Sequence, residues 1–565
     1  ERVYPAIVAG SDFGLDLSWG EPSRYEEKML FLERQMLTDF SMKQPPNDFS
    51  SATATLNRGR RSLLKGGLAT LAGAPFFAAS AARGETAAPS TPQLIDPARV
   101  NAGQAAKSPA EMDGLFEQIK REATPVQLYR FLYAMPKGGD IHHHLGGGFL
   151  PRMWLAIGTD PQRNGGQRFY TRYRVTNTRP HPLLSKPGVS HIFLWRTLNA
   201  AHYESLPADF KKDLKPLDEL NASEQAAWMS SVVLDEPGEG RNEFFEYHWT
   251  RLGDLMSSIH VMSELLVENM KLFGSEGTRY LEIQRGYAGY RDASGALLPS
   301  EEAEAFWAAR LAQPDAVATG VTVRWQAIVL RFADDAEEMV QQHFAFLDAN
   351  RESWVGINMA GREDDNRGFP RRFTEVYDAM LARYPGIGIS IHAGEAEKPD
   401  SHIRDTLRLG ASRIGHGINL IWDTETMQRM RYAPYLVEIN LISNELLGYV
   451  PDLSKHPFPV YLRQGILCCL NTDDRGMWDS NFTDEYYVAV TRFNLSFAEL
   501  KKLARNSYEH SFAEPGLKTQ LIADYERDVD AFAAEFSESN WQPICNRIPA
   551  ITHGYGANPS FPIRG

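Results

Sequence analysis

The chain has 565 residues, of which 43% are hydrophobic and 23% charged. This balance is typical of a globular protein with a large core, and it excludes a disordered, collagen-like or coiled-coil chain. The net charge of −13 argues against a general affinity for nucleic acid, because phosphate binding needs a cationic surface. The 3 cysteines cannot make a disulfide framework and lack the spacing of a zinc knuckle, so any metal site must use histidines and carboxylates.

The N-terminal part of the chain contains a pattern typical of a twin-arginine export signal. Arg60 and Arg61 precede an uncharged stretch, Gly66–Ala82, that ends in small residues. The apolar run is too short and too rich in alanine and glycine for a membrane span of about 20 residues. We therefore expect a periplasmic or secreted protein without stable membrane anchoring. The alternative interpretation is a basic helix start followed by an alanine-rich core helix.

This signal lies unusually far into the chain. Because signals begin near the initiator and the chain starts with Glu1, we expect residues 1–41 to be an upstream extension of the reading frame. The signal would then occupy 42–82, starting at Met42. Residues 83–108 are rich in Ala, Pro, Gly, Ser and Thr and predict a linker.

Eight short β-branched runs alternate with amphipathic helical stretches in the remainder of the chain. They are Gly138–His144, Thr278–Gln284, Val321–Val329, Trp354–Asn358, Ile387–His392, Arg413–His416, Leu436–Ile442 and Ile466–Asn471. A repeated strand–helix pattern implies parallel strands, and eight such units predict an α/β fold, the (β/α)8 TIM barrel. Helical patterns at Met112–Ala134 and Phe497–Phe536 flank it, so we expect a barrel domain over 109–540 and a C-terminal tail over 541–565.

One gap interrupts this rhythm. Between His144 and Thr278 lie loop-like, proline-rich sequence and a helical pattern over Asn242–Leu272. Loops that follow barrel strands lie on the C-terminal face, where active sites are built. We therefore expect residues 145–277 to form an insertion that covers the site as a lid.

Residues with metal-binding side chains stand where several of these strands end. His142 and His144 alternate on the first strand and so point to the same side, whereas His143 points away and is expected to pack. Others end the fifth, sixth and eighth strands: His392, His416 and Asp473. Imidazoles with a carboxylate suit Zn²⁺ and leave room for a water molecule. The alternative is a set of buried core histidines.

Several motifs follow one another in a fixed order. Met135–His144 reads MPKGGDIHHH; after it come Ala360-Gly361, HAGE at His392–Glu395, GHG at Gly415–Gly417, Ser443-Asn444 and NTDD at Asn471–Asp474. In these motifs the chain resembles the adenosine deaminase family of the metallo-dependent hydrolase superfamily. The MPKGGxxHxH opening is nearest to that of the secreted, growth-factor-like branch.

This resemblance implies hydrolytic deamination, in which adenosine and water give inosine and ammonia. It places Zn²⁺ on His142, His144, His392 and Asp473. The ion supplies reactivity by lowering the pKa of a water molecule from about 15.7 towards about 7. His416 would act as a base and orient the water, and Asp473 counts among the catalytic residues.

The resemblance also assigns contacts to the purine. Glu395 would donate a proton to N1, Asp474 would pair with N7, and the amide of Gly361 would face N3. Two alternatives stay open: Glu395 as a first-turn helix carboxylate favoured by the helix dipole, and Asp474 as a partner of the zinc ligands.

The chain departs from the family in one place. Adenosine deaminases commonly carry an acidic ribose-binding residue just after the second histidine, whereas here Leu145 is followed by three glycines. The sugar contact would then come from the lid, around Glu246, His248 and Trp249, unless that segment is a helix face packed on the barrel. Arg475 would add a cation near the mouth.

We therefore expect an exported zinc deaminase whose partner is a small purine nucleoside. The family branch suits a homodimer. One alternative is a metal-dependent hydrolase of another aminopurine, a nucleotide or an amide. A second is a non-catalytic extracellular protein that binds purines or signals.

Overall fold

The structure, a computed structural model, describes residues 107–172, 196–236, 238–364 and 367–557. The predicted extension, the predicted signal and most of the predicted linker lie outside these residues. Eight parallel strands form one sheet: β1 (Asp140–His144), β5 (Tyr280–Arg285), β6 (Thr322–Leu330), β7 (Trp354–Ala360), β8 (Gly388–Ala393), β9 (Arg413–His416), β10 (Leu436–Ile439) and β11 (Leu467–Leu470). The predicted (β/α)8 barrel is confirmed.

The sheet curls until its two edge strands meet. Each strand pairs in parallel with the next one along the chain, from β1 to β11. The edge is closed by main-chain hydrogen bonds from His144 N to Asp473 O (3.2 Å) and from Asp473 N to His142 O (3.0 Å). The closure of the barrel therefore brings the predicted ligands of β1 next to Asp473, although 329 residues separate His144 from it.

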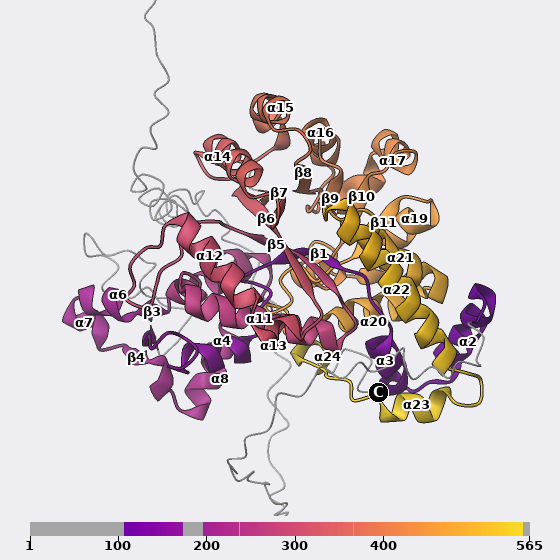
Figure 1. Ribbon diagram of the computed structural model, residues 1–565, viewed down its shortest axis with the longest axis horizontal. Coiled ribbons are helices and arrows are strands. Elements are labelled where there is room, and N and C mark those ends of the chain that lie inside the picture. Colours follow the sequence, from indigo (N-terminus) through magenta and orange to yellow (C-terminus); the bar gives the residue numbers. More distant parts are fainter. Residues whose placement is uncertain (1–106, 173–195, 237, 365–366, 558–565) are drawn as a thin grey trace, which may run out of the picture.

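Helices surround the barrel between successive strands (Figure 1). They are α12 (Ser300–Leu311), α13 (Pro314–Val317), α14 (Ala336–Ala349), η7 (Pro370–Phe373), α15 (Thr374–Arg383), α16 (His402–Arg408), η8 (Ile418–Trp422), α17 (Thr424–Arg431), α18 (Leu441–Leu446), η9 (Leu453–Lys455), α19 (Phe458–Arg463) and α20 (Phe482–Phe493). Both faces of the strands are buried, as expected for a parallel sheet covered by helices. Among the described residues, no helix has the length and hydropathy needed to cross a membrane.

Most of the insertion after β1 forms a group of elements beside the barrel, and its last helix, α11, packs against the barrel itself (Figure 1). It contains α4 (Pro151–Gly158), β2 (Phe169–Arg172), β3 (Leu198–Asn199), α6 (Ala200–Ser205), α7 (Ala208–Lys211), β4 (Leu214–Pro216), η4 (Leu217–Glu219), α8 (Ala222–Ser230), α9 (Arg241–Glu243), η5 (Phe244–His248), α10 (Trp249–Leu252), η6 (Gly253–Leu255) and α11 (Ile259–Ser275). Strands β3, β2 and β4 make a small antiparallel sheet. An insertion therefore follows the first barrel strand, as expected, whereas its role as a lid stays a prediction.

The helix predicted over Asn242–Leu272 is interrupted. Gly253 adopts φ +50° at the end of α10, and a Cβ there would lie 2.5 Å from Thr197 O. Only glycine accepts this combination of positive φ and close approach. A new helix, α11, then starts at the N-cap Ser258, so the predicted helix is divided into several short elements and the long helix α11.

The terminal helices are also divided more finely than predicted. Met112–Ala134 forms α2 (Pro109–Glu122) and α3 (Pro125–Ala134), because Thr124 caps the second helix and Pro125 starts it. The C-terminal region forms α21 (Phe497–Glu509), α22 (Pro515–Glu535), α23 (Trp541–Arg547) and α24 (Gly554–Ala557). Helices α3 and α23 lie side by side, joined by a hydrogen bond from Gln127 Nε2 to Asn546 Oδ1 (3.1 Å) (Figure 1).

The MPKGG segment fastens α3 to the base of the barrel. Lys137 is fully buried, and its Nζ donates to the carbonyls of Leu132 (2.7 Å) and Glu276 (2.9 Å). The next residue, Gly138, packs so closely on α21 that a Cβ would lie 2.5 Å from Ala504 O. This motif therefore has a structural role at the start of β1.

His343 on α14 predicts a pH dependence of stability. Its ring is 1% exposed, neither ring nitrogen has a hydrogen-bond partner among the described residues, and burial lowers its pKa to about 3. The unfolded chain, with a histidine pKa near 6.5, therefore binds an extra proton below that pH, and stability is lost as the pH falls below about 6.5. His343→Leu should remove about 2 kcal/mol of this loss at pH 5. Urea unfolding at pH 5 and pH 8 checks this, and an identical pH dependence in both proteins would contradict it.

Candidate active site

The predicted ligands converge at the C-terminal ends of the strands. His144 Nε2 lies 3.2 Å from His392 Nε2 and 3.1 Å from Asp473 Oδ1. His142 Nε2 lies 3.5 Å from the same carboxylate oxygen, and His416 Nε2 lies 4.0 Å from the other one. All five side chains are buried. The structure thus gathers four imidazoles and one carboxylate from β1, β8, β9 and the segment after β11.

The chemistry of this cluster fits a metal ion. His142 Nε2 and Asp473 Oδ1 are buried and have no hydrogen-bond partner among the described residues, which is costly for polar atoms. Ligand-type atoms lie within 4.8 Å of one another in two sets that share Asp473: His142, His392, His416 and Asp473, and His144, Asp473 and Asp474. A cation with nitrogen and oxygen ligands would satisfy these atoms.

The outer nitrogens of two imidazoles face hydrogen-bond acceptors. His142 Nδ1 lies 2.7 Å from Glu438 Oε2, and His392 Nδ1 lies 2.9 Å from Asn358 Oδ1. Glu438 is itself held by the buried Arg413, whose Nε donates to it at 2.6 Å. An acceptor behind Nδ1 places the proton there and leaves Nε2 as a lone pair towards the cluster. Glu438 was not predicted from the sequence, although a charged residue inside the apolar strand β10 is a signal for such a role.

His143 points out of the barrel, as its position on β1 predicts. Its Nε2 lies 2.9 Å from Asn269 Nδ2 on α11 and its Nδ1 lies 3.0 Å from Thr472 Oγ1. The ring also packs edge-on against Phe273, with 5.2 Å between centroids. It therefore joins the strand to the helix layer and takes no part in the cluster.

Two residues of the cluster have strained backbones. His416 adopts φ 64° and Asp473 adopts φ 53°, a left-handed conformation that non-glycine residues rarely take. Such strain costs on the order of 1–3 kcal/mol and persists where the surroundings determine it. It turns the chain sharply at the ends of β9 and β11, where these two side chains enter the cluster.

Glu395 lies just beyond β8 at the edge of the cluster. It is 4% exposed, and burial together with the charge of Asp473 raises the pKa of its carboxyl well above the usual range. Its main-chain N–H and that of Gly394 each donate to Glu363 at 3.0 Å. Glu363 therefore fixes the loop that carries Glu395, a role that sequence reasoning missed and that the motif Ala360-Gly361 just before it could have indicated. A raised pKa favours the neutral form of this carboxyl, the form that can donate a proton.

Asp474 and Gly361 lie at the same mouth. Asp474 is 3% exposed, and its Oδ1 has no partner among the described residues. Gly147 makes room for it, because a Cβ on this glycine would lie 1.7 Å from Asp474 Oδ1. Burial and the charge of Asp473 raise the pKa of Asp474 well above its usual range. Gly361 directly follows β7 with φ +107°, and a Cβ there would lie 2.7 Å from the Phe332 ring.

The two predicted lid residues, Trp249 and His248, face different parts of the structure. Trp249 covers the loop after β1, because a Cβ on Gly146 would lie 3.0 Å from the indole and 3.1 Å from Met256 Sδ. No acidic side chain fits there unless these groups move. His248 is buried and turned towards Glu239, 3.7 Å from Nε2 to Oε1, so the structure gives it no contact with the cluster.

Arg475 does not add a cation at the mouth, and that expectation is wrong. Its guanidinium is fully buried, lies 3.8 Å from the centre of the Phe273 ring and pairs with Glu276 at 3.2 Å. The side chain therefore packs against α11 and the residue that follows it. Its position next to Asp474 in the sequence gave no indication of this partner.

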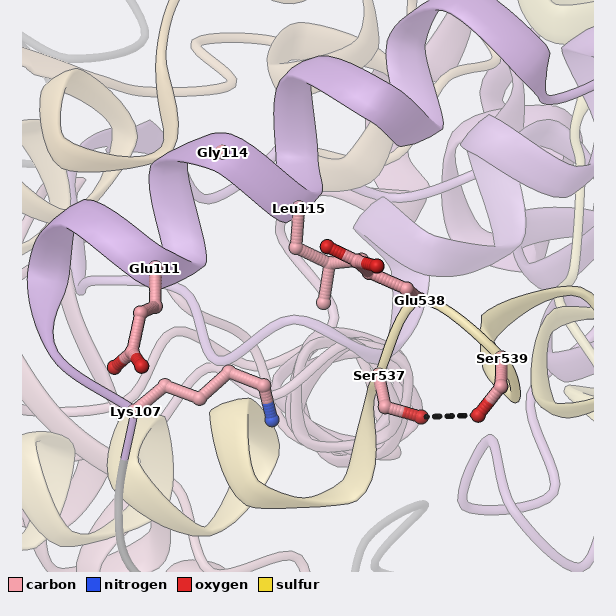
Figure 2. Close-up of a pocket in the computed structure, with 7 residues that line it drawn as sticks. All are labelled: Lys107, Glu111, Gly114, Leu115, Ser537, Glu538 and Ser539. Atoms are coloured by element: carbon pink, nitrogen blue, oxygen red, sulfur yellow. Dashed lines mark hydrogen bonds between the residues drawn. The ribbon is translucent and has the colours of Figure 1, made fainter.

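A hollow in the described residues lies away from this cluster. It has a volume of about 560 Å³ and lies between the start of α2 and the turn after α22 (Figure 2). Its lining is Lys107, Glu111, Gly114, Leu115, Ser537, Glu538 and Ser539. None of these belongs to the predicted site, and the lining holds no histidine or cysteine, so the catalytic candidate is the cluster at the strand ends.

Fold and site together define the chain as a hydrolase of the metallo-dependent barrel class. A family profile described as adenosine deaminase matches residues 221–527. The adenosine deaminase of Pseudoalteromonas translucida (strain TAC 125) is 30% identical over 311 residues, which cover 54% of this chain and 88% of the relative. The chain belongs to the adenosine deaminase family, and it is a deaminase-type hydrolase.

Other relatives resemble smaller parts of the chain or the fold alone. An adenine deaminase of Chelativorans sp. (strain BNC1) is 32% identical over 169 residues, 30% of this chain and 51% of the relative. The crystal structure of an amidohydrolase from Burkholderia ambifaria with bound Zn has a TM-score of 0.52 at 18% identity and covers 72% of this chain and 94% of that one. The second similarity is one of fold.

Proposed function

We propose that the chain is a zinc-dependent hydrolytic deaminase that converts adenosine, or a closely related 6-aminopurine nucleoside, to inosine and ammonia. The observation that carries this proposal is the cluster itself. Unpaired ligand atoms of His142 and Asp473 converge next to Glu395, a buried carboxyl with a raised pKa. A metal site and a proton donor side by side are what hydrolytic deamination needs.

His142, His144, His392 and Asp473 would hold the zinc ion. Three imidazoles and one carboxylate form a typical catalytic donor set. When bound, zinc lowers the pKa of a water molecule towards about 7 and so supplies a nucleophile at neutral pH. Glu438 and Asn358 would orient two of the ligands from behind.

The remaining residues act on the purine. The oxygen of water adds to C6 while the neutral carboxyl of Glu395 donates its proton to N1. The C6–N bond then breaks and the amine leaves as ammonia with the first proton lost by the water. The second water proton leaves the C6 hydroxyl and restores the Glu395 carboxyl, and C6 keeps the oxygen as a carbonyl. His416 orients the water, the Asp474 carboxyl pairs with N7, and the Gly361 amide faces N3.

A second candidate substrate class follows from the lid. Trp249 and Met256 fill the space beside Gly146 that a ribose-binding carboxylate would need. An aromatic and a thioether surface favours a purine whose 9-substituent is absent or less polar than ribose. Free adenine or a modified nucleoside is therefore the alternative substrate, and one of the relatives is named an adenine deaminase.

Trp249→Ala tests the contribution of the lid to binding. Because the indole would stack on the substrate at roughly 1–2 kcal/mol, we expect the variant to raise KM for the best substrate by roughly 10-fold and to change kcat by less than about 3-fold. Steady-state kinetics measure both constants. Tyr432→Ala, at a side chain that is 80% exposed, is the control. An unchanged KM would assign Trp249 to packing alone.

A panel of purines tests the proposed reaction. Ammonia release and ultraviolet absorbance are followed with adenosine, deoxyadenosine, adenine, AMP and N6-methyladenosine. We expect adenosine or a close nucleoside to have the highest kcat/KM. Turnover of adenine or a nucleotide without turnover of adenosine would overturn the substrate assignment. Binding of purines without ammonia release would favour a non-catalytic binder.

We further propose that the enzyme is exported by the twin-arginine route. The support is the order of Arg60-Arg61, an uncharged stretch and small residues in the sequence. N-terminal sequencing of the exported protein should begin near Ala82. Recovery of mature protein that begins with Glu1 would contradict the proposal.

A further inference from the structure

His456 begins a chain of hydrogen bonds that leads to the cluster. Its Nδ1 accepts the main-chain N–H of Phe458 at 3.1 Å. A main-chain nitrogen can only donate, so Nδ1 carries no proton. The ring is 3% exposed, and a neutral imidazole must then carry its proton on Nε2.

That proton fixes the orientation of Asn444. His456 Nε2 lies 3.0 Å from Asn444 Oδ1, which accepts it. The oxygen and nitrogen of an amide cannot be told apart by shape, but here the donor on His456 decides between them. Asn444 therefore turns its Nδ2 towards His416, 3.0 Å from Nδ1 of that ring.

His416 thus has hydrogen-bond donors behind it. Besides Asn444, Asn440 Nδ2 lies 3.2 Å from the same Nδ1. Glu395 Oε1 lies 3.5 Å from this nitrogen without making a hydrogen bond. Two amide donors require a lone pair on Nδ1, and a neutral ring then has its proton on Nε2, the atom that faces Asp473 Oδ2 at 4.0 Å.

This arrangement is the reverse of that around two of the metal-ligand candidates. His142 and His392 have acceptors behind Nδ1, Glu438 and Asn358, and so present lone pairs to the cluster. His416 presents an N–H. A protonated nitrogen cannot coordinate a metal or accept a proton, but it can donate a hydrogen bond to an oxygen atom.

We infer that Asn444 and His456 are positioning residues that hold His416 in its Nε2–H tautomer, so that His416 acts as a hydrogen-bond donor to the attacking oxygen and not as a base. This inference rests on the proposed function. The inference gives the Ser443-Asn444 motif a physical role. It also means that the proton lost by water is accepted by Asp473 Oδ2, the oxygen that faces His416 Nε2.

Asn444→Asp is the variant that tests this inference. The side chain keeps its size and still accepts from His456, but a carboxylate oxygen replaces the donor behind His416 and should move the ring proton to Nδ1. Long-range ¹H–¹⁵N correlation of ¹⁵N-histidine-labelled, zinc-loaded protein reports the tautomer, with His416→Gln assigning the signal. We expect an Nε2–H pattern in the native protein, its inversion in Asn444→Asp, and a fall in kcat of roughly 10²-fold with KM within about 3-fold.

Asn358→Asp is the matched comparison. It adds the same charge to the same cluster, but behind His392, where an acceptor already lies. The His416 signal should keep its Nε2–H pattern in this variant. Inversion there as well would show that charge alone moves the proton, and would overturn the role of Asn444.

His456 provides a second test in case Asn444→Asp does not fold. His456→Gln keeps an N–H for Asn444 Oδ1 and should retain the native His416 pattern, whereas His456→Leu should lose it and lower kcat by roughly 10-fold. A native protein with its His416 proton on Nδ1 would refute the inference, as would a pattern unchanged in Asn444→Asp and His456→Leu. An Nε2–H pattern without ammonia release from any purine would instead refute the proposed function and leave the hydrogen-bond assignment standing.

Discussion

Replacing Glu395 with glutamine is expected to lower kcat by at least about 10²-fold, the usual scale for removing a general acid. Glutamine keeps the size of the side chain and can donate a hydrogen bond to N1, but it cannot transfer a proton. Because Glu395 is not among the proposed ligands, the zinc content should stay at that of the native protein. Stopped assays of ammonia release and metal analysis of the same sample measure the two quantities.

The pH profile adds a second reading of the same residue. Burial raises the pKa of Glu395, and the protonated form is the active one, so the rate should fall as the pH rises above that raised pKa. Glu395→Gln should lose this alkaline limb. Glu397→Gln, two residues further on and with a side chain that is 52% exposed, is the control and should change kcat by less than about 3-fold. A Glu395→Gln enzyme as fast as the native one would refute the assignment of the proton donor.

Replacing His392 with alanine is expected to remove the metal and to lower the activity by at least about 10³-fold. The ring lies between His144 and Asn358, at 3.2 Å and 2.9 Å from its two nitrogens, and its loss leaves three of four ligands. A catalytic metal contributes several kcal/mol to the reaction, and each 1.4 kcal/mol or so is tenfold in rate. Metal analysis after gel filtration and the purine assay check both losses.

His260→Ala is the control for this variant. His260 lies on α11, where its ring packs edge-on against Phe306 with 4.9 Å between centroids. It should keep the native metal content and activity. Full metal occupancy in His392→Ala would contradict the ligand assignment, even if the activity were lost.

The fold was predictable because the barrel repeats one simple unit. Each of the eight predicted runs overlaps one strand of the sheet, since buried parallel strands are short β-branched runs that stand out from amphipathic helices. Helix boundaries were less predictable. The interruption at Gly253 depends on contact with Thr197, which no local pattern shows, whereas Pro125 was a local signal for dividing the first helix.

The ligand candidates were predictable because their side chains are rare at strand ends and share one chemistry. The hydrogen-bond partners on the far side of these imidazoles were not predictable. Glu438, Asn358 and Asn444 act through the outer nitrogens of three imidazoles, and only the barrel brings them there. The error for Arg475 has the same origin, because its partner Glu276 is 199 residues away in the sequence.

Titration of zinc into the metal-free chain tests whether a single ion makes the site active. The protein is stripped with a chelator, zinc is added in steps, and bound metal and ammonia release from the best purine substrate are followed together. We predict that the stripped protein is inactive and that its activity rises linearly until one zinc is bound per chain. The His416→Gln variant should also bind one zinc per chain. Full activity without metal, or an end point other than one zinc per chain, would contradict a single ion held by His142, His144, His392 and Asp473.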